Sequence, residues 1–228
     1  MAGKQKLIRF EQMKSFPNVY EEGVETFRAD NFKLKGKWAS EHFKNDHPIT
    51  LELACGKGEF TVDLARRNPD RNYIGVDIKG SRMFVGAKTA LDESLNNAAF
   101  LRTRIDFITA FFAPEEIDEI WIVHPDPQLK RGRERKRLTS KLFIDRYRRI
   151  LKHDGVIRLK TDSRPMFDYS LEEVQSRGCQ LIQAVPEVYG NIDALDSDLA
   201  FAVQIKTHYE QLFVEKGHQI HYLSFKLN

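Results

Sequence analysis

The chain of 228 residues contains only two cysteines, Cys55 and Cys179. Two isolated cysteines supply neither a disulfide framework nor the paired spacing of a metal site, and they suit a reducing compartment. The first residues, MAGKQKLIRFEQ, lack the apolar run of a secretory signal, and no stretch approaches the ~18 apolar residues of a membrane span. We therefore expect a cytoplasmic protein with no metal and no membrane partner.

A strong net charge is also missing, because 36 basic residues face 33 acidic ones and leave a formal charge of +3. A weak total says little about partners, so the distribution of charge matters more. The stretch HPDPQLKRGRERKR, residues 124–137, ends in eight residues that hold six cations and one acid. A solvated face is the ordinary explanation for such a run, and a polyanionic partner is the other.

Strand patterns and helix patterns alternate from residue 49 onward. We expect strands at residues 49–55, 72–78, 98–105, 117–125, 156–162, 179–186 and 218–227, and helices at 59–68, 80–96, 138–152, 165–178 and 205–216. This alternation predicts an α/β fold with a mostly parallel, doubly wound, Rossmann-like sheet and an antiparallel C-terminal edge strand. Residues 1–48 are irregular but rich in aromatics, which predicts an N-terminal arm packed on the domain formed by residues 49–228.

A turn with two glycines follows the first strand of this domain. Gly56 and Gly58 lie between a strand and a helix, where glycines let the backbone approach a ligand. Asp77 ends the next strand, roughly twenty residues on, where an acid can hold both hydroxyls of a ribose. A nucleotide-like cofactor is the interpretation we favour over a plain turn.

The residues around this turn favour S-adenosylmethionine (SAM) over a dinucleotide. The third glycine of a dinucleotide fingerprint is replaced by Thr61, and Glu52 lies in the strand just before the turn. An acid there repels a pyrophosphate but suits the ammonium and sulfonium groups of SAM. Asp106 follows the third strand, where such folds contact the adenine, although helix capping explains it equally well.

An aspartate between two prolines follows the fourth strand. Ligands of open α/β sheets bind beyond the carboxyl ends of the strands, so Asp126 should face the site, held stiffly by Pro125 and Pro127. The basic run follows at once. A polyanion that carries a base to be modified fits both features, and a surface turn is the alternative.

Five motifs together resemble the bacterial tRNA (guanine-N7-)-methyltransferase family, in the family's order and over most of residues 35–227. They are LELACGKGEF, YIGVDIKGS, HPDPQLKRGRERKRLT, LKTDSR and KTHYEQLF. The resemblance implies a class I SAM-dependent methyltransferase that methylates N7 of a guanine at position 46 in the variable loop of tRNA. The family often has tryptophan where Gln128 stands, so a stacking role at this position has no support. A monomer and a homodimer both stay open.

The resemblance also implies roles for individual residues. Cofactor contacts would come from the glycine turn and four acids, Glu52, Asp77, Asp106 and Asp126, of which Asp126 is also the catalytic candidate. Contacts with the substrate base would come from Lys130, Asp162, Thr207, Tyr209 and Glu210. Contacts with tRNA would come from Arg131, Arg133, Arg135, Lys136 and Arg137. Capping is a second explanation for Asp162, and for Thr207 with Glu210, which form a T-x-x-E capping box.

Three other functions are weighed against this one. Pro-Asp-Pro is similar to the Asp/Asn-Pro-Pro-aromatic motif of enzymes that methylate the exocyclic amine of adenine in RNA or DNA, but no aromatic residue follows it here. An NAD-dependent oxidoreductase would need the third glycine and would have no use for the basic run. A non-catalytic RNA-binding protein would not need an acid at every cofactor position.

Overall fold

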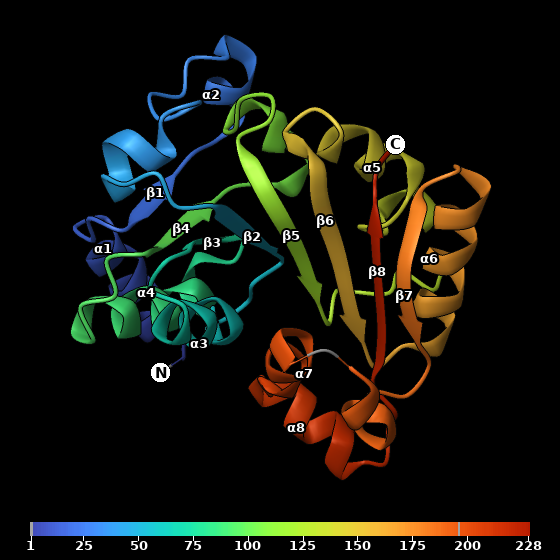
Figure 1. The fold of residues 1–228 in the computed structure, drawn as a ribbon. Coiled ribbons are helices and arrows are strands. Elements are labelled where there is room, and N and C mark those ends of the chain that lie inside the picture. Colours follow the sequence, from blue (N-terminus) through green and yellow to red (C-terminus); the bar gives the residue numbers. More distant parts are fainter. Residues whose placement is uncertain (1, 196) are drawn as a thin grey trace.

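The computed structural model describes residues 2–195 and 197–228 (Figure 1). Its strands are β1 (Val19–Glu21), β2 (Ile49–Leu53), β3 (Asn72–Asp77), β4 (Ala98–Arg102), β5 (Ile117–Val123), β6 (Leu151–Thr161), β7 (Gln180–Val185) and β8 (His221–Lys226). Its α-helices are α1 (Ala2–Met13), α2 (Val24–Ala29), α3 (Glu59–Arg67), α4 (Gly80–Asp92), α5 (Lys141–Tyr147), α6 (Arg164–Ser176), α7 (Ser197–Gln204) and α8 (His208–Glu215). Short segments of other helix types are Trp38–Phe43, Ile105–Ala110, Glu134–Lys136 and Tyr189–Ala194.

The strands form one sheet in the order β1-β4-β3-β2-β5-β6-β8-β7. Neighbours from β1 to β6 are parallel, and β8 is antiparallel to both β6 and β7. The antiparallel direction of the C-terminal strand is confirmed, but its expected place at the edge is corrected, because β7 forms the edge. Five of the six residues of β8 are buried, whereas β7 begins with three exposed residues, so the better buried strand takes the inner place.

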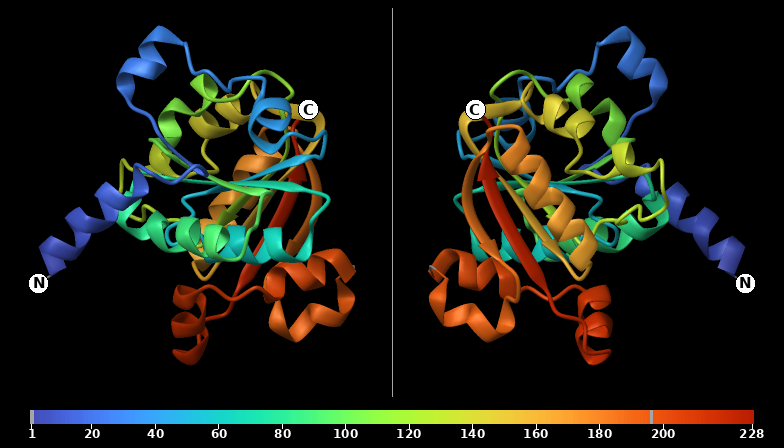
Figure 2. Two further views of the ribbon diagram at one scale, coloured as in Figure 1. Left: turned by 90° about the vertical axis from the view of Figure 1, so that its left-hand side faces the viewer. Right: turned by 90° about the vertical axis from the view of Figure 1, so that its right-hand side faces the viewer.

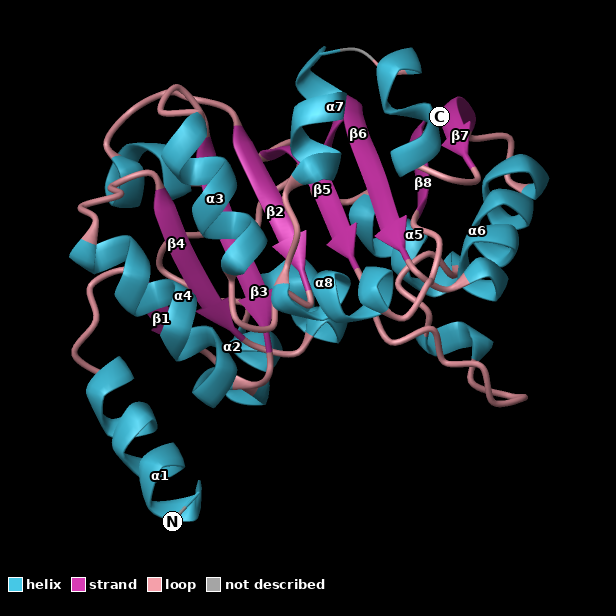
Figure 3. Cartoon of the chain, turned by 90° about the horizontal axis from the view of Figure 1, so that it is seen from below, coloured by secondary structure: helices cyan, strands magenta, loops and turns pink. Residues whose placement is uncertain are grey.

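Helices cover both faces of the sheet (Figures 2 and 3). Two apolar cores lie between the sheet and these helices. Successive residues of a strand point to opposite faces. In β4, for example, Ala99 and Leu101 face the core with α5 and α6, while Ala98 and Phe100 face the core with α3, α4 and α7. The central strands β2 and β3 are buried along their whole length, which is typical of a doubly wound α/β sheet.

The N-terminal residues extend the sheet by one strand. Strand β1 pairs with β4, with Tyr20 opposite Leu101. Trp38 is fully buried, and its indole Nε1 donates a hydrogen bond to the carbonyl of Phe111 at 3.0 Å. Residues we expected to be irregular therefore include α1, β1 and α2.

One expected helix is much shorter than the sequence suggested. Residues 138–152 were predicted to be helical, but α5 ends at Tyr147 and β6 begins at Leu151. Leu151 pairs with Ile117 of β5, and Ile117 donates its backbone N–H to the carbonyl of Ile150 at 3.0 Å. Residues 151 and 152, which apolar spacing assigned to the helix, therefore belong to strand β6.

The carboxyl ends of the parallel strands β2, β3, β5 and β6 lie together at one end of the strands. The chain moves from β2 outward to β3 and β4, and then returns to the other side of β2 to form β5 and β6. The reversal makes the gap between β2 and β5 the switch point, where open α/β sheets bind ligands. Helix α8 lies beside the tips of β5 and β6 (Figure 1). None of the described helices has both the length and the apolar character needed to cross a membrane.

Candidate active site

A cavity of about 510 Å³ lies at these strand ends. It collects residues that the sequence places far apart, from the glycine turn to the start of α8. Of the residues predicted to be functional, the following line it: Glu52, Gly56, Asp77, Asp126, Asp162, Thr207 and Tyr209. Four predicted carboxyl groups, together with Glu59, therefore meet at one end of the parallel strands.

Backbone donors hold the carboxylate of Asp77 in place. Gly56 donates its N–H to Asp77 Oδ2 at 2.9 Å, and Lys79 donates its N–H to Oδ1 at 2.8 Å. Gly56 has a φ of +58°, and a Cβ on it would meet no atom closer than 4.0 Å, so the space beside its backbone is open to a ligand. The glycine turn thus orients an acid and leaves room for a ligand beside it.

Glu52 is buried under the turn. Its Oε2 accepts hydrogen bonds from Thr61, from the backbone N–H at 2.8 Å and from the hydroxyl group. Burial raises the pKa of Glu52 to about 8, although the two bonds from Thr61 act in the opposite direction. Without a bound cation, Glu52 is therefore mostly protonated at neutral pH.

The Pro-Asp-Pro segment bends sharply at both ends. His124 and Gln128 have left-handed backbone angles, with φ of 45° and 47°, which non-glycine residues rarely adopt. Gln128 donates its N–H to Asp126 Oδ1 at 3.0 Å, so Asp126 also stabilises its own turn. Asp126 is therefore both a turn residue and a residue of the cavity, so the two explanations do not exclude each other.

A buried polar network adjoins the cavity, which two of its members, His124 and Asp162, also line. His124 donates from Nδ1 to Asp162 Oδ1 at 3.2 Å, and its Nε2 lies 3.1 Å from Glu210 Oε2. The same oxygen of Glu210 pairs with Lys160 Nζ at 2.8 Å, and the hydroxyl of Tyr189 donates to Glu210 Oε1. The side chains of Lys160 and Glu210 are completely buried.

The contacts within this network set its charge state. Burial lowers the pKa of His124, but the contacts with Asp162 and Glu210 outweigh burial and leave the pKa raised. Burial likewise raises the pKa of both carboxyls, and the pairing with His124 and Lys160 outweighs it, so both pKa values end below their usual range. Burial lowers the pKa of Lys160 to about 8.

Sequence reasoning missed His124, Lys160 and Tyr189. The pattern did hold a signal for Lys160, since a lysine inside the apolar strand VIRLKTD needs a buried partner. The sequence also left a substrate role and a capping box open for Thr207 and Glu210, and the structure shows only half of the capping box. Thr207 accepts the N–H of Glu210 at 3.3 Å and caps α8, but the Glu210 side chain turns into the network instead of back to the helix end.

Several predicted residues lie outside the cavity. Gly58 has a packing role, since a Cβ on it would come within 2.5 Å of the Phe100 ring. Asp106 lies elsewhere, paired with Arg104 at 3.3 Å and Arg146 at 3.7 Å. Glu210 is buried behind the lining, and Lys130 is exposed on the loop beyond Asp126.

The basic residues of the loop at positions 130–137, called the basic loop below, divide into two groups. Arg131, Arg133, Arg135 and Lys136 are exposed. Arg137 is buried, where its Nε donates to the carbonyl of Pro127 at 3.1 Å and its guanidinium lies 4.2 Å from the Tyr169 ring centroid. Arg137 therefore anchors the end of the loop to the Pro-Asp-Pro segment, and the other four cations face solvent.

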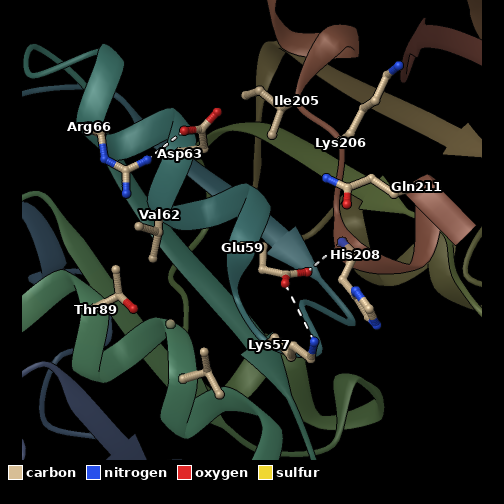
Figure 4. A pocket seen from close by; sticks show the side chains of 12 residues that line it. Lys57, Glu59, Val62, Asp63, Arg66, Thr89, Ile205, Lys206, His208 and Gln211 are labelled. Carbon is tan, nitrogen blue, oxygen red and sulfur yellow. Dashed lines mark hydrogen bonds and ion pairs between the residues drawn. The ribbon is translucent and has the colours of Figure 1, made fainter.

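A second cavity, of about 420 Å³, shares the lining residues Lys57 and Glu59 with the first (Figure 4). Glu59 joins its two walls, because one carboxylate oxygen accepts the N–H of His208 at 3.0 Å and the other lies 3.7 Å from Lys57 Nζ. Glu59 thereby ties the first residue of α8 to the turn that follows β2.

Comparison with known proteins agrees with this geometry. A family model described as "Putative methyltransferase" matches residues 46–223. The tRNA (guanine-N(7)-)-methyltransferase of Christiangramia forsetii is 47% identical over the whole of both chains. The enzyme of the same name from Bacteroides thetaiotaomicron is 46% identical over 99% of this chain and 86% of its own.

Solved structures share the fold at low identity. The 16S rRNA methyltransferase KamB matches with a TM-score of 0.58 and 15% identity, over 90% of this chain and 92% of its own. The 16S rRNA (adenine(1408)-N(1))-methyltransferase of Catenulisporales acidiphilia, solved with SAM, matches with a TM-score of 0.55 and 12% identity, over 86% of this chain and 93% of its own.

The sheet and the acid-lined cavity at its switch point define a Rossmann-like, class I SAM-dependent methyltransferase. The relatives allow a narrower statement: the chain belongs to the tRNA (guanine-N7-)-methyltransferase family. An NAD-dependent oxidoreductase is thereby set aside.

The residues of the cavity fit SAM. Carboxyls at Glu52, Asp77 and Asp126 suit a ligand that carries an ammonium, a sulfonium and a ribose but no phosphate. The open space at Gly56 lets such a ligand approach the backbone.

The raised pKa of Glu52 leads to a prediction about SAM binding. A bound cation favours the carboxylate, so binding lowers the pKa of Glu52 and releases a proton. SAM affinity should therefore rise with pH, by at most about tenfold per pH unit, and level off above about 8. Calorimetry between pH 6 and 9 measures this, and Glu52→Gln should flatten the curve. Equal slopes for the two proteins would show that another group carries the proton.

Proposed function

We propose that this chain transfers a methyl group from SAM to N7 of a guanine in tRNA, at position 46 of the variable loop. The observation that carries the proposal is the meeting of Asp126 and Asp162 at the ends of neighbouring strands, in the cavity that also holds Glu52 and Asp77. The names of the relatives supply the substrate. A tRNA substrate also supports a cytoplasmic location.

The reaction asks little acid–base chemistry of the protein. Guanine N7 has a free lone pair and no proton, so no base is needed before it attacks the methyl carbon that SAM supplies. The N7–C bond forms as the S–C bond breaks, and the purine becomes cationic. The chain contributes alignment of the base and a negative environment for the new charge, through Asp126 and Asp162.

The same two carboxylates can select guanine. Guanine offers N–H donors at N1 and N2 on one edge, a pattern that adenine lacks, and a carboxylate accepts from both. Thr207 and Tyr209, at the start of α8, border the cavity and complete the wall around the base. Asp126 and Asp162 thus serve recognition as well as charge stabilisation.

The exposed cations of the basic loop bring the RNA to this wall. The loop follows Asp126 directly, and Arg137 fixes its far end to Pro127. Phosphates bound by Arg131, Arg133, Arg135 and Lys136 would therefore lie next to the cavity mouth. Lys130, between Asp126 and these cations, is placed to contact the nucleotide that enters.

The direct test is incubation with labelled SAM and tRNA transcripts that carry guanine or adenine at position 46. Mapping should find N7-methylguanine at that position in the first transcript and no label there in the second. Label on an adenine amine would support the other methyltransferase class. Absence of label in every transcript would overturn the proposal.

The exposed part of the basic loop should act on RNA alone. Changing Arg133, Arg135 and Lys136 to alanine should weaken tRNA binding and reduce its salt dependence, by at most about 0.9 log units of slope for each phosphate that the variant no longer binds. SAM affinity should not change. Filter binding over a series of salt concentrations measures this.

A matched control removes two arginines and one lysine at the opposite end of the strands, with Arg67, Arg149 and Lys152 changed to alanine. These residues are exposed and lie near the starts of β3 and β6. Equal salt slopes for the two triple variants would show that the loop is only a solvated face.

A further inference from the structure

His124 occupies an unusual place for a titratable side chain. It directly follows β5, its side chain is only 5% exposed, and its ring lies between two carboxylates from different elements. Asp162 follows β6, and Glu210 belongs to α8. The left-handed backbone of His124 turns the chain at this point. The ring therefore joins two parts of the chain that no local sequence rule connects.

The two carboxylates differ in what else they contact. Glu210 is completely buried and is held by Lys160 and by the hydroxyl of Tyr189. Lys160 is fixed in turn, because it also donates to the carbonyl of Ile205 at 3.0 Å. Glu210 is therefore a rigid anchor that cannot reach a ligand. Asp162 is 20% exposed at its side chain and lines the cavity.

Because Glu210 is fixed, the His124 ring beside it can fix the orientation of the Asp162 carboxylate in the cavity. His124 Nε2 faces the anchor, and Nδ1 fixes Oδ1 of Asp162. The ring of His218 also lies near Asp162, but its Nδ1 is 3.8 Å from Oδ2, beyond hydrogen-bonding distance. Among the described residues, His124 is the side chain that sets how the Asp162 carboxylate turns toward a bound base.

We propose that His124 is a positioning residue for guanine selectivity, because it orients Asp162 toward the N1 and N2 donors of the substrate base. The proposal rests on the proposed function and deepens it, since it names the side chain that makes the carboxylate selective. His124 also lines the cavity, but both of its ring nitrogens face carboxylates, so it acts on the base through Asp162.

Two substitutions of His124 separate its ring nitrogens. Asparagine places its amide nitrogen near the position of Nδ1, so His124→Asn keeps a donor for Asp162 and no longer reaches Glu210. Glutamine places its amide nitrogen near the position of Nε2, so His124→Gln still reaches Glu210 but has no donor for Asp162. His153 is exposed and lies in β6, and His153→Gln is the matched control.

The readout is the ratio of kcat/KM for a tRNA transcript with guanine at the target position to that for one with inosine, which lacks only the N2 amino group. The ratio is taken within one enzyme preparation, so partial loss of folded protein cancels. Wild type and His153→Gln should favour guanine by about 10- to 100-fold, as expected for one hydrogen bond to a charged group. His124→Asn should keep most of this preference, and His124→Gln should lose most of it.

The outcomes distinguish the two proposals. If wild type methylates neither transcript, the proposed function fails. If wild type methylates guanine but shows no preference over inosine, or if His124→Gln keeps the preference, the role of His124 is overturned while the function stands. A His124→Asn enzyme that loses the preference as fully as His124→Gln would also overturn it, because the ring would then act through general packing.

Discussion

Replacing Asp126 by alanine should lower single-turnover methylation of tRNA by about two to four orders of magnitude, the usual range for losing one preorganised electrostatic group. The carboxylate lies at the end of β5 between two prolines, and the N–H of Gln128 fixes one of its oxygens. It should hold the base and favour the positive charge that develops on the purine. Binding of tRNA should change little, because the exposed cations lie on the loop beyond it.

Single-turnover rates at saturating SAM and tRNA test this expectation, with Asp154→Ala as a control for an exposed aspartate. Asp126→Asn keeps the shape and removes the charge, so it should be nearly as slow if charge is what matters. An Asp126→Asn enzyme within a few-fold of wild type would assign the effect to hydrogen-bond geometry. An Asp126→Ala enzyme at the wild-type rate would show that Asp126 acts only as a turn residue.

Removing the carboxylate of Asp77 should affect the cofactor and spare the RNA. We expect Asp77→Ala to weaken SAM binding by about 1–3 kcal/mol, through loss of charge-assisted hydrogen bonds to the ribose. The variant also loses the acceptor for the N–H groups of Gly56 and Lys79, so the glycine turn becomes less ordered. Affinity for tRNA should stay near the wild-type value.

Calorimetry with SAM and filter binding with tRNA measure the two affinities separately. Asp70 is exposed near the other end of β3, so Asp70→Ala removes the same group without reaching the cavity. Wild-type SAM affinity in Asp77→Ala would remove Asp77 from the ribose role. An equal loss in Asp70→Ala would show that the effect is one of net charge.

The central strands and the main acids of the cavity could be predicted from the sequence. Strands β2, β3 and β5 are short, strongly apolar runs bounded by turn residues, and parallel strands bring their carboxyl ends to one edge. An acid at the end of such a run therefore has a predictable position. Asp77 and Asp126 satisfy this condition, Glu52 lies one residue before the end of β2, and Asp162 was expected from the family resemblance; all four line the cavity.

Features that depend on distant partners were not predictable in this way. Strand β1 has three residues, too few to show a period, and it forms only by pairing with β4. Asp106 follows β4 at a plausible position, but the chain turns away and Arg104 and Arg146 pair with the carboxylate. The network of His124 and Lys160 needs Glu210, which lies 50 or more residues further along the chain.

The inner position of β8 affects when the sheet can be completed during synthesis. Strands β6 and β7 are complete by residue 185, yet the strand that lies between them consists of residues 221–226. Until residues 221–226 have been synthesised, β6 lacks its antiparallel neighbour and β7 has no strand to pair with among the described residues, so both leave backbone groups unpaired. Strand β7 can therefore join the sheet only through β8, and the pairing of β8 with β6 is a contact between segments distant in sequence, of the kind that slows folding.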